Sequence, residues 1–277
     1  MTATFGARLR AALDENGPLC VGIDPHAALL EAWGLPQSAE GVRDFGLAVV
    51  AAAAGRVVAV KPQVSFFERF GARGFAALEE VMAAARAVAL LVIADAKRGD
   101  IGTTNAGYAE AWLAQDAPLE ADALTVSPYL GVGALGPIAE LAQQNGKGLF
   151  VLAATSNPEG AVVQRALEGG EPVARRVAEE AGVGSPGAAL GSIGLVIGAT
   201  VDRESFALDD ALLAGTPILA PGFGTQGADP SDLVRRFGPL ARNVLANESR
   251  SILGAGPEGL VAAIDARAAR YREVLGG

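Results

Sequence analysis

Cysteine and histidine are almost absent from this chain of 277 residues. The single Cys20 cannot form an intramolecular disulfide, and one cysteine with one histidine, His26, cannot furnish an ordinary zinc site. His26 follows Asp24 and Pro25, a context more typical of a turn at a strand end than of a catalytic acid or base. Any chemistry must therefore rely on Asp, Lys, Ser or similar groups, and we expect no metal site.

Long apolar runs and basic runs are missing as well. No apolar stretch approaches the roughly 18 residues of a membrane span, and the first 17 residues have the pattern of a charged amphipathic helix rather than of a secretory signal. The 22 basic and 31 acidic residues give a net charge of -9, without a run that could follow a nucleic-acid backbone. We expect a soluble, cytoplasmic protein that binds neither membranes nor nucleic acid.

What the chain does contain is a regular alternation of short apolar runs and longer segments with helical spacing. The apolar runs have no polar face, which is typical of a parallel sheet covered by helices. Eight such runs in about 250 residues predict an α/β fold, a (β/α)8 TIM barrel formed by residues 1–277 as a single domain. We expect an N-terminal helix, and the longest connection, about 157–190, is a candidate insertion over the barrel mouth. The eight expected strands begin near residues 19, 56, 89, 121, 148, 194, 216 and 243.

Polar side chains follow these runs at their carboxyl ends, where barrels of this kind carry their chemistry. In DAKRGDIGTT, at 95–104, strand alternation places Asp95 and Lys97 on one face. A solvated rim with a weak ion pair would explain one such end, but charges at several ends favour a functional cluster. The other polar ends are Asp24, Lys61, Ser127, Thr155, Ser156, Glu248, Ser249, Arg250 and Ser251.

The segment GFGTQG at 222–227 matches a dinucleotide-binding pattern, with Glu248 at a suitable distance for a ribose contact. Too little chain follows it to complete a doubly wound sheet, so a dinucleotide site is disfavoured. In a barrel, a glycine loop after the seventh strand can instead hold a phosphate with its backbone N–H groups. Arg250 would supply charge and Gln226 a hydrogen bond, and the loop could close as a lid. A merely structural turn is the alternative.

Taken in order, VKPQ, DAKRGDIGTT, SPYLG, PGFGTQG and SRSI resemble the orotidine 5'-phosphate decarboxylase family over nearly the whole chain. LCVGIDPH and ATSNP resemble its longer bacterial group. The resemblance implies a homodimeric barrel without metal or cofactor that converts orotidine 5'-phosphate to UMP and carbon dioxide in pyrimidine synthesis. Two departures stand out: Ser249 replaces the glycine that many relatives carry before the arginine, and VKPQ differs from the shorter homologues.

The resemblance also implies roles for individual residues. The catalytic array corresponds to Lys61, Asp95, Lys97 and Asp100, and Asp100 crosses with Ile101 and Thr104 into the partner's site. Lys97 would stabilise negative charge at C6 and then protonate it. The remaining expected contacts are Asp24 and Lys61 to the ribose, Ser127 to the pyrimidine, and Pro221, Gly222, Gln226, Gly227 and Arg250 around the phosphate.

Two other hypotheses remain open at this point. Sugar-phosphate decarboxylases and hexulose-phosphate synthases share the barrel and an Asp-x-Lys-x-x-Asp strand end, and their acidic residues would bind Mg²⁺. The flanking lysines and the SPYLG and SRSI stretches favour the nucleotide substrate. A barrel that only binds a phosphorylated ligand is the second alternative, although a binding module has little need of an ammonium group between two carboxylates.

Overall fold

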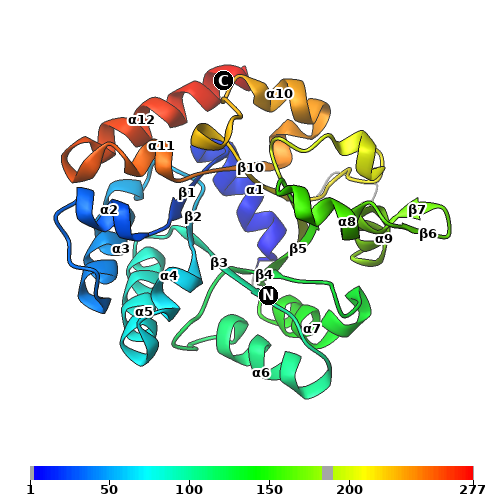
Figure 1. Ribbon diagram of the computed structural model, residues 1–277, viewed down its shortest axis with the longest axis horizontal. Helices are drawn as coiled ribbons and strands as arrows, with labels where there is room; N and C mark the ends of the chain where they lie inside the picture. Colours follow the sequence, from blue (N-terminus) through cyan, green and yellow to red (C-terminus); the bar gives the residue numbers. More distant parts are fainter. Residues whose placement is uncertain (1–2, 183–189, 277) are drawn as a thin grey trace.

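The computed structural model describes residues 3–182 and 190–276, and the eight strands expected from the sequence are all present. They form a closed parallel barrel in the order β1-β10-β9-β8-β5-β4-β3-β2, with helices around it (Figure 1). The predicted TIM barrel is confirmed. The strands are β1 Leu19–Ile23, β2 Ala59–Pro62, β3 Leu91–Arg98, β4 Ala123–Val126, β5 Gly148–Ala154, β8 Ile193–Ile197, β9 Ile218–Pro221 and β10 Val244–Glu248.

The outer helices cover strands whose backbone is buried almost throughout, as expected for a parallel sheet with both faces covered. Helix follows strand in most of the chain, but the connection from β8 to β9 has only a short 3-10 turn, Arg203–Phe206, ended by Ala207 in a left-handed conformation. The strict alternation expected from the sequence fails at that point. The outer helices are α2 Ala27–Ala32, α3 Ala39–Ala53, α4 Val64–Glu68, α5 Gly71–Ala87, α6 Gly102–Leu113, α7 Gly136–Gln144, α9 Val173–Glu180, α10 Asp232–Phe237, α11 Arg250–Leu253 and α12 Gly256–Val274.

Helix α1 (Phe5–Asn16) closes the amino end of the barrel, and Figure 1 shows it crossing the ring of strands. Its apolar residues Phe5, Leu9 and Leu13 recur every four positions and pack with interior side chains such as Cys20 and Phe150. A side chain at Gly148 would overlap the Phe5 ring, at 2.2 Å from Cδ1, so glycine makes room for this closure. The interior below the carboxyl end is therefore filled by side chains.

Four charged residues tie α1 to the barrel, and we call them the amino-end cluster: Arg8, Glu120, Asp122 and Lys147. The Arg8 guanidinium lies 2.6 Å from Asp122 Oδ1, and Lys147 Nζ lies 2.5 Å from Glu120 Oε1. Asp122 Oδ2 also accepts a hydrogen bond from the Val92 backbone N–H. The neighbouring Arg86 lies 4.0 Å from Glu120 Oε2, so every charge of this cluster is paired where the strands begin.

The long connection after β5 contains a short helix, α8 (Ala161–Gln164), and a two-stranded hairpin, β6 (Leu167–Glu168) with β7 (Glu171–Pro172), which projects from the barrel in Figure 1. Helix α9 follows and packs on β5, so it is a regular barrel helix rather than inserted chain. The rest of the predicted insertion, residues 183–189, lies outside the described residues. Gln164 ties α8 to the end of β5, because its Oε1 accepts from the Thr155 N–H and its Nε2 donates to Thr155 Oγ1.

None of the helices between residues 3 and 276, the 183–189 gap aside, is long and apolar enough to cross a membrane.

Candidate active site

A cavity of about 240 Å³ lies inside the barrel at the carboxyl ends of the strands. The strand faces that fill the interior below also line this cavity, because residues two positions apart point the same way. Ala59 and Ile93 lie in the apolar interior, and Lys61 and Asp95 lie above them in the cavity wall. The interior thus changes from apolar to charged within one layer of side chains. Seven of the residues predicted for the site line this cavity: Asp24, Lys61, Asp95, Lys97, Pro221, Gln226 and Arg250.

At its centre Asp95 joins two lysines, and we call Lys61, Asp95 and Lys97 the carboxyl-end cluster. Lys61 Nζ lies 2.7 Å from Asp95 Oδ2, and Lys97 Nζ lies 2.6 Å from Asp95 Oδ1. The Thr125 hydroxyl donates to the same Oδ1 over 3.0 Å. The Lys61 side chain is 5% exposed and that of Lys97 is 46% exposed. The second ammonium group therefore faces the cavity, while the first is enclosed.

Burial and charge oppose each other in this cluster. Burial alone would raise the pKa of Asp95, but the attraction of Lys61 and Lys97 and their hydrogen bonds hold that pKa well below its usual range. Burial alone would lower the pKa of Lys61, yet the nearby carboxylates Asp95 and Asp24 raise it above its usual value. The two groups keep opposite charges around neutral pH.

The backbone at Lys97 differs from the regular strand expected there. The register of β3 on β4 shifts between Ala94 and Arg98, and Lys97 has a positive φ of 48°. The Lys97 N–H donates to Thr125 Oγ1 over 2.9 Å, which holds this conformation. Strand alternation correctly predicts that Lys97 lies beside Asp95, but it does not predict the bulge that directs the Lys97 side chain. A non-glycine residue in the left-handed region is costly and is often found at functional sites.

Several polar atoms in the cavity wall have no partner within the protein. Asp24 Oδ1, Asn247 Oδ1 and Ser249 Oγ are buried without a hydrogen bond in the described chain. Asn247 lies in register with Pro221 on β9 and with Cys20 on β1, so it faces the interior. Buried polar groups normally have partners, and these three atoms belong to residues that line the cavity.

The glycine loop after β9 uses part of its backbone internally. Gly224 N donates to Ala228 O, Gly227 N to Gly224 O, and Ala228 N to Gly222 O. These three N–H groups are used within the loop, so they are not available for the phosphate cradle suggested by the sequence pattern. The side chains of Gln226 and Arg250 both line the cavity from this end.

The other predicted contacts lie outside the cavity wall of the single chain: Asp100, Ile101, Thr104, Ser127, Gly222 and Gly227. The Asp100 carboxylate accepts from the Ile101 N–H over 2.8 Å, and the Ile101 side chain is 62% exposed. Ser127 follows β4 directly, and its N–H donates to Arg98 O.

Four polar lining residues were not named as site residues from the sequence: Gln63, Thr125, Thr225 and Asn247. The period-two rule could have found Asn247, two positions after the interior Leu245. The same rule corrects Glu248, which was counted among the polar strand ends. Glu248 is 0% exposed and faces away from the cavity, toward α12.

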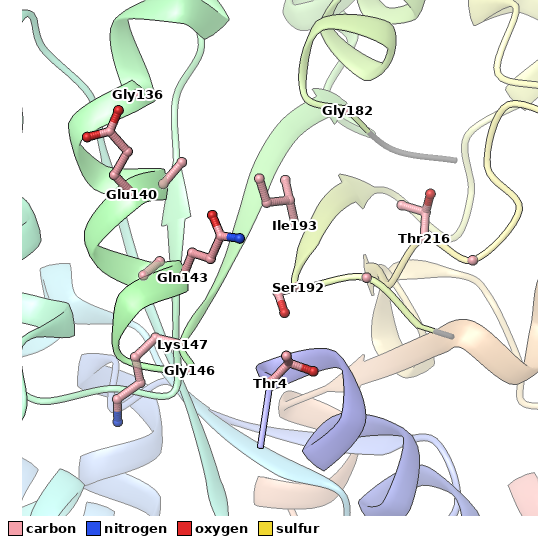
Figure 2. A pocket seen from close by; sticks show the side chains of 14 residues that line it. Thr4, Gly136, Glu140, Gln143, Gly146, Lys147, Gly182, Ser192, Ile193 and Thr216 are labelled. Carbon is pink, nitrogen blue, oxygen red and sulfur yellow. The ribbon is translucent and has the colours of Figure 1, made fainter. Parts of the chain in front are cut away.

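A larger hollow of about 450 Å³ lies at the amino end, between α7 and the start of β8 (Figure 2). Its charged residues do not converge on a common point, and Lys147 is already paired with Glu120 and Asp122. The chain leaves the described residues at Gly182, on the rim of this hollow. The chemistry therefore points to the smaller cavity at the carboxyl end.

The described residues contain no group of three or more His, Cys, Asp and Glu side chains arranged to hold a metal ion. Asp95 is poorly suited to bind a cation, because each of its oxygens is within 2.7 Å of an ammonium nitrogen.

The family model described as orotidine 5'-phosphate decarboxylase / HUMPS family matches residues 17–264. The chain belongs to that family. It is 55% identical to an orotidine 5'-phosphate decarboxylase of Streptomyces coelicolor over 92% of this chain and 91% of that one, and 48% identical to one of Corynebacterium efficiens over 93% and 92%. The predicted family and the class of enzyme, a carboxy-lyase, are confirmed.

Solved structures agree with this assignment. A Streptomyces avermitilis crystal structure described as this type of decarboxylase superposes with a TM-score of 0.92 at 51% identity, covering 100% of this chain and 97% of that one. The orotidine 5'-phosphate decarboxylase of Leishmania donovani gives 0.80 at 30% identity, covering 99% of each chain. The family covers the whole barrel, including the charged strand ends.

Proposed function

We propose that the chain converts orotidine 5'-phosphate to UMP and carbon dioxide, with Lys97 as the group that stabilises charge at C6 and then protonates it. One observation carries this proposal: the Lys97 ammonium is fixed 2.6 Å from a buried carboxylate and still faces the cavity. Cleavage of the C6 carboxylate bond leaves its electron pair on C6, where the ring cannot delocalise it well. A preorganised cation beside that carbon lowers the barrier.

The proton balance follows from the same group. The Lys97 ammonium gives its proton to the electron pair on C6, which forms the new C–H bond of UMP, and the resulting amine regains a proton from solvent. Asp95 holds the direction of the ammonium, and Thr125 and Lys61 hold Asp95. Lys61 is too enclosed to replace Lys97 as the donor.

The remaining groups are assigned to parts of the substrate. Asp24 and Lys61 would contact the ribose hydroxyls, supported by the unpartnered Asp24 Oδ1 in the cavity wall. Gln226 and Arg250 would hold the phosphate at the β9 and β10 end, where Pro221 begins the loop. Gly222 and Gly227 would shape this loop, and Ser127 would bind the pyrimidine.

Asp100, Ile101 and Thr104 are assigned to the neighbouring subunit's site in a homodimer. The exposure of Ile101, together with exposed Tyr129 (79%) and Leu130 (54%) after β4, supports a surface that packs against another copy. Each active site would then contain a carboxylate from the other chain.

The magnesium-dependent sugar-phosphate chemistry found on this fold is disfavoured by the geometry. Each oxygen of Asp95 lies within 2.7 Å of an ammonium nitrogen, and these positive charges oppose the binding of Mg²⁺ there. A purely binding function would not require an ammonium group held in direction by a buried carboxylate, as Lys97 is by Asp95.

The first test is the absorbance change of orotidine 5'-phosphate after addition of EDTA-treated protein. We expect Lys97→Ala to lower kcat by at least about a thousandfold, because both charge stabilisation and proton donation are lost. Lys147→Met, which removes a buried lysine from the amino-end cluster, is the matched control and should keep its activity. A folded Lys97→Ala enzyme with near-wild-type kcat would refute the assignment, and an inactive wild type would refute the reaction.

The shared site is tested by mixing two inactive chains. Asp100→Ala and Lys97→Ala homodimers should each have little activity, and a hybrid dimer would contain one site with neither substitution. We expect up to about a quarter of wild-type activity after equimolar exchange, since half of the dimers are hybrids and each has one complete site. No recovery after exchange verified by mass spectrometry would contradict the assignment of Asp100 to the partner's site.

A further inference from the structure

The most thoroughly buried carboxylate that the proposed chemistry does not use belongs to Glu248, at the end of β10. Three side chains bind it. Tyr271 Oη donates to Oε1 over 2.7 Å, Ser251 Oγ donates to Oε2 over 2.5 Å, and the Arg267 guanidinium lies 2.8 Å from Oε2. Tyr271 and Arg267 come from α12, and Ser251 comes from α11. An isolated buried charge is costly, and this one is neutralised and fully hydrogen-bonded.

The glycine loop packs on this group through Phe223 and Gly224, and a third contact follows directly after the loop. The Phe223 ring meets the Tyr271 ring edge to face, with centroids 5.7 Å apart. Gly224, with a φ of 74°, packs so closely that a Cβ there would lie 2.3 Å from Ser251 Oγ and 2.8 Å from Glu248 Oε2. Beyond the loop, Asp229 Oδ2 lies 4.0 Å from an Arg267 nitrogen. The loop that carries Gln226 therefore packs on the Glu248 group at the end of β10.

The same carboxylate also supports Arg250, the second residue proposed to bind the substrate phosphate. Ser251 directly follows Arg250 at the start of α11, and its hydroxyl is bonded to Glu248. Burial and the adjacent Glu248 charge raise the pKa of Tyr271, so its hydroxyl stays a hydrogen-bond donor. Gln226 reaches the cavity from the glycine loop and Arg250 reaches it from α11. Glu248 is hydrogen-bonded to α11 through Ser251 and packs against the loop at Gly224.

We propose that Glu248 is a positioning residue for phosphate recognition, which sets the glycine loop and the start of α11 so that Gln226 and Arg250 bind the substrate phosphate together. The inference rests on the proposed function, because it assigns a support to the phosphate contacts of that reaction. It also explains the strong burial of a carboxylate that does not face the cavity. A residue that served the fold alone would affect all substrates equally.

The test compares orotidine 5'-phosphate with orotidine, which lacks the phosphate, in wild type and in Glu248→Gln. The ratio of the two kcat/KM values measures the benefit of the phosphate. We expect this ratio to fall about ten- to a hundredfold in the variant, since small misplacements of positioning groups have effects of that size. The value for orotidine should change little. Ser251→Ala, which removes only one hydroxyl between Glu248 and α11, should lower the ratio in the same direction.

Asp122→Asn is the matched control, because it neutralises another buried carboxylate at the opposite end of the barrel. It should lower the melting temperature without changing the ratio. An unchanged ratio in folded Glu248→Gln would overturn the inference, and Ser251→Ala alone decides the matter if Glu248→Gln does not fold. Failure of the wild type to act on orotidine 5'-phosphate would instead contradict the proposed function, so the two failures are distinguishable.

Discussion

The barrel carries a buried charge cluster at each end, and the two differ in what they leave open. In the amino-end cluster, two basic and two acidic groups pair with one another and with backbone groups, and the Arg8 guanidinium also donates to Gly146 O. In the carboxyl-end cluster, one carboxylate pairs with two lysines, and the Lys97 side chain is 46% exposed. Similar ion pairs thus close one end of the molecule and leave a cation facing a cavity at the other.

This difference shows that burial and ion pairing do not identify a functional site by themselves. Both Asp95 and Asp122 are less than 10% exposed and bound to cations at 2.6 Å. What distinguishes the Asp95 end is the exposed Lys97 side chain together with unpartnered acceptors, Asp24 Oδ1 and Asn247 Oδ1, in residues of the same cavity wall. Unsatisfied groups around a cavity, rather than perturbed groups alone, indicate where a ligand binds.

The largest expected contrast comes from the same substitution at both ends. Asp95→Asn should reduce kcat at least about a hundredfold, because Lys97 loses the carboxylate that directs it. Asp122→Asn should leave kcat within about twofold and destabilise the fold by about 3 kcal/mol, as expected when one partner of a buried pair is removed. Steady-state kinetics and urea unfolding would measure the two effects. Equal losses of kcat in the two variants would abolish the distinction between the ends.

A smaller effect concerns acid stability. A carboxyl group with a lowered pKa in the folded state contributes its full stabilisation above its unfolded pKa, about 4, and loses it as the pH falls through the folded value. Asp95 is such a group. Wild type should therefore lose on the order of 1 kcal/mol more than Asp95→Asn between pH 5 and pH 3. Urea unfolding at both pH values would show parallel losses if Asp95 did not contribute in this way.

The opposite sign applies to Lys61, whose pKa is raised. Its contribution is complete below the unfolded value, about 10.4, and is lost only as the pH rises through the folded value. Between about pH 5 and pH 9 both groups keep their charges, so a change of kcat in that window must come from another group.

The smallest expected effect is a difference in thiol labelling. Cys20 is buried in the interior between the two clusters, and burial raises the pKa of its thiol to about 12. Native protein at pH 8 should react with iodoacetamide at least about a thousandfold more slowly than unfolded protein. Asp122→Asn should speed labelling more than Asp95→Asn, because it loosens α1 over the amino end. The reverse order would indicate that the interior opens from the cavity side.

Much of this architecture could be predicted from the sequence, because parallel strands buried on both faces have to be apolar throughout. The eight strands and the barrel follow from that pattern. The polar residues that end the apolar runs place Lys61, Asp95 and Lys97 at the mouth of the barrel. The helix expected between β8 and β9 did not form, since residues 198–217 favour turns over a continuous apolar stripe.

Side-chain direction was the harder part. Alternation predicts that Asn247 faces inward and Glu248 outward, whereas the position of Glu248 at a strand end predicts a place on the rim, and the structure follows the alternation. The left-handed Lys97 could not be predicted, because a bulge depends on the neighbouring strand β4 and its Thr125. Asn247 and Asp24 come together only through closure of the barrel between β10 and β1, which no local pattern encodes.

The closure of the amino end by α1 also determines how molecules move through the enzyme. With Phe5, Leu9 and Phe150 filling the interior, the cavity has no exit below, so substrate must enter and both products must leave through one mouth. The glycine loop stands at that mouth, next to the proposed phosphate contacts. UMP must then leave before the next substrate molecule can enter, and the residence time of UMP beneath the loop sets an upper limit on the turnover rate.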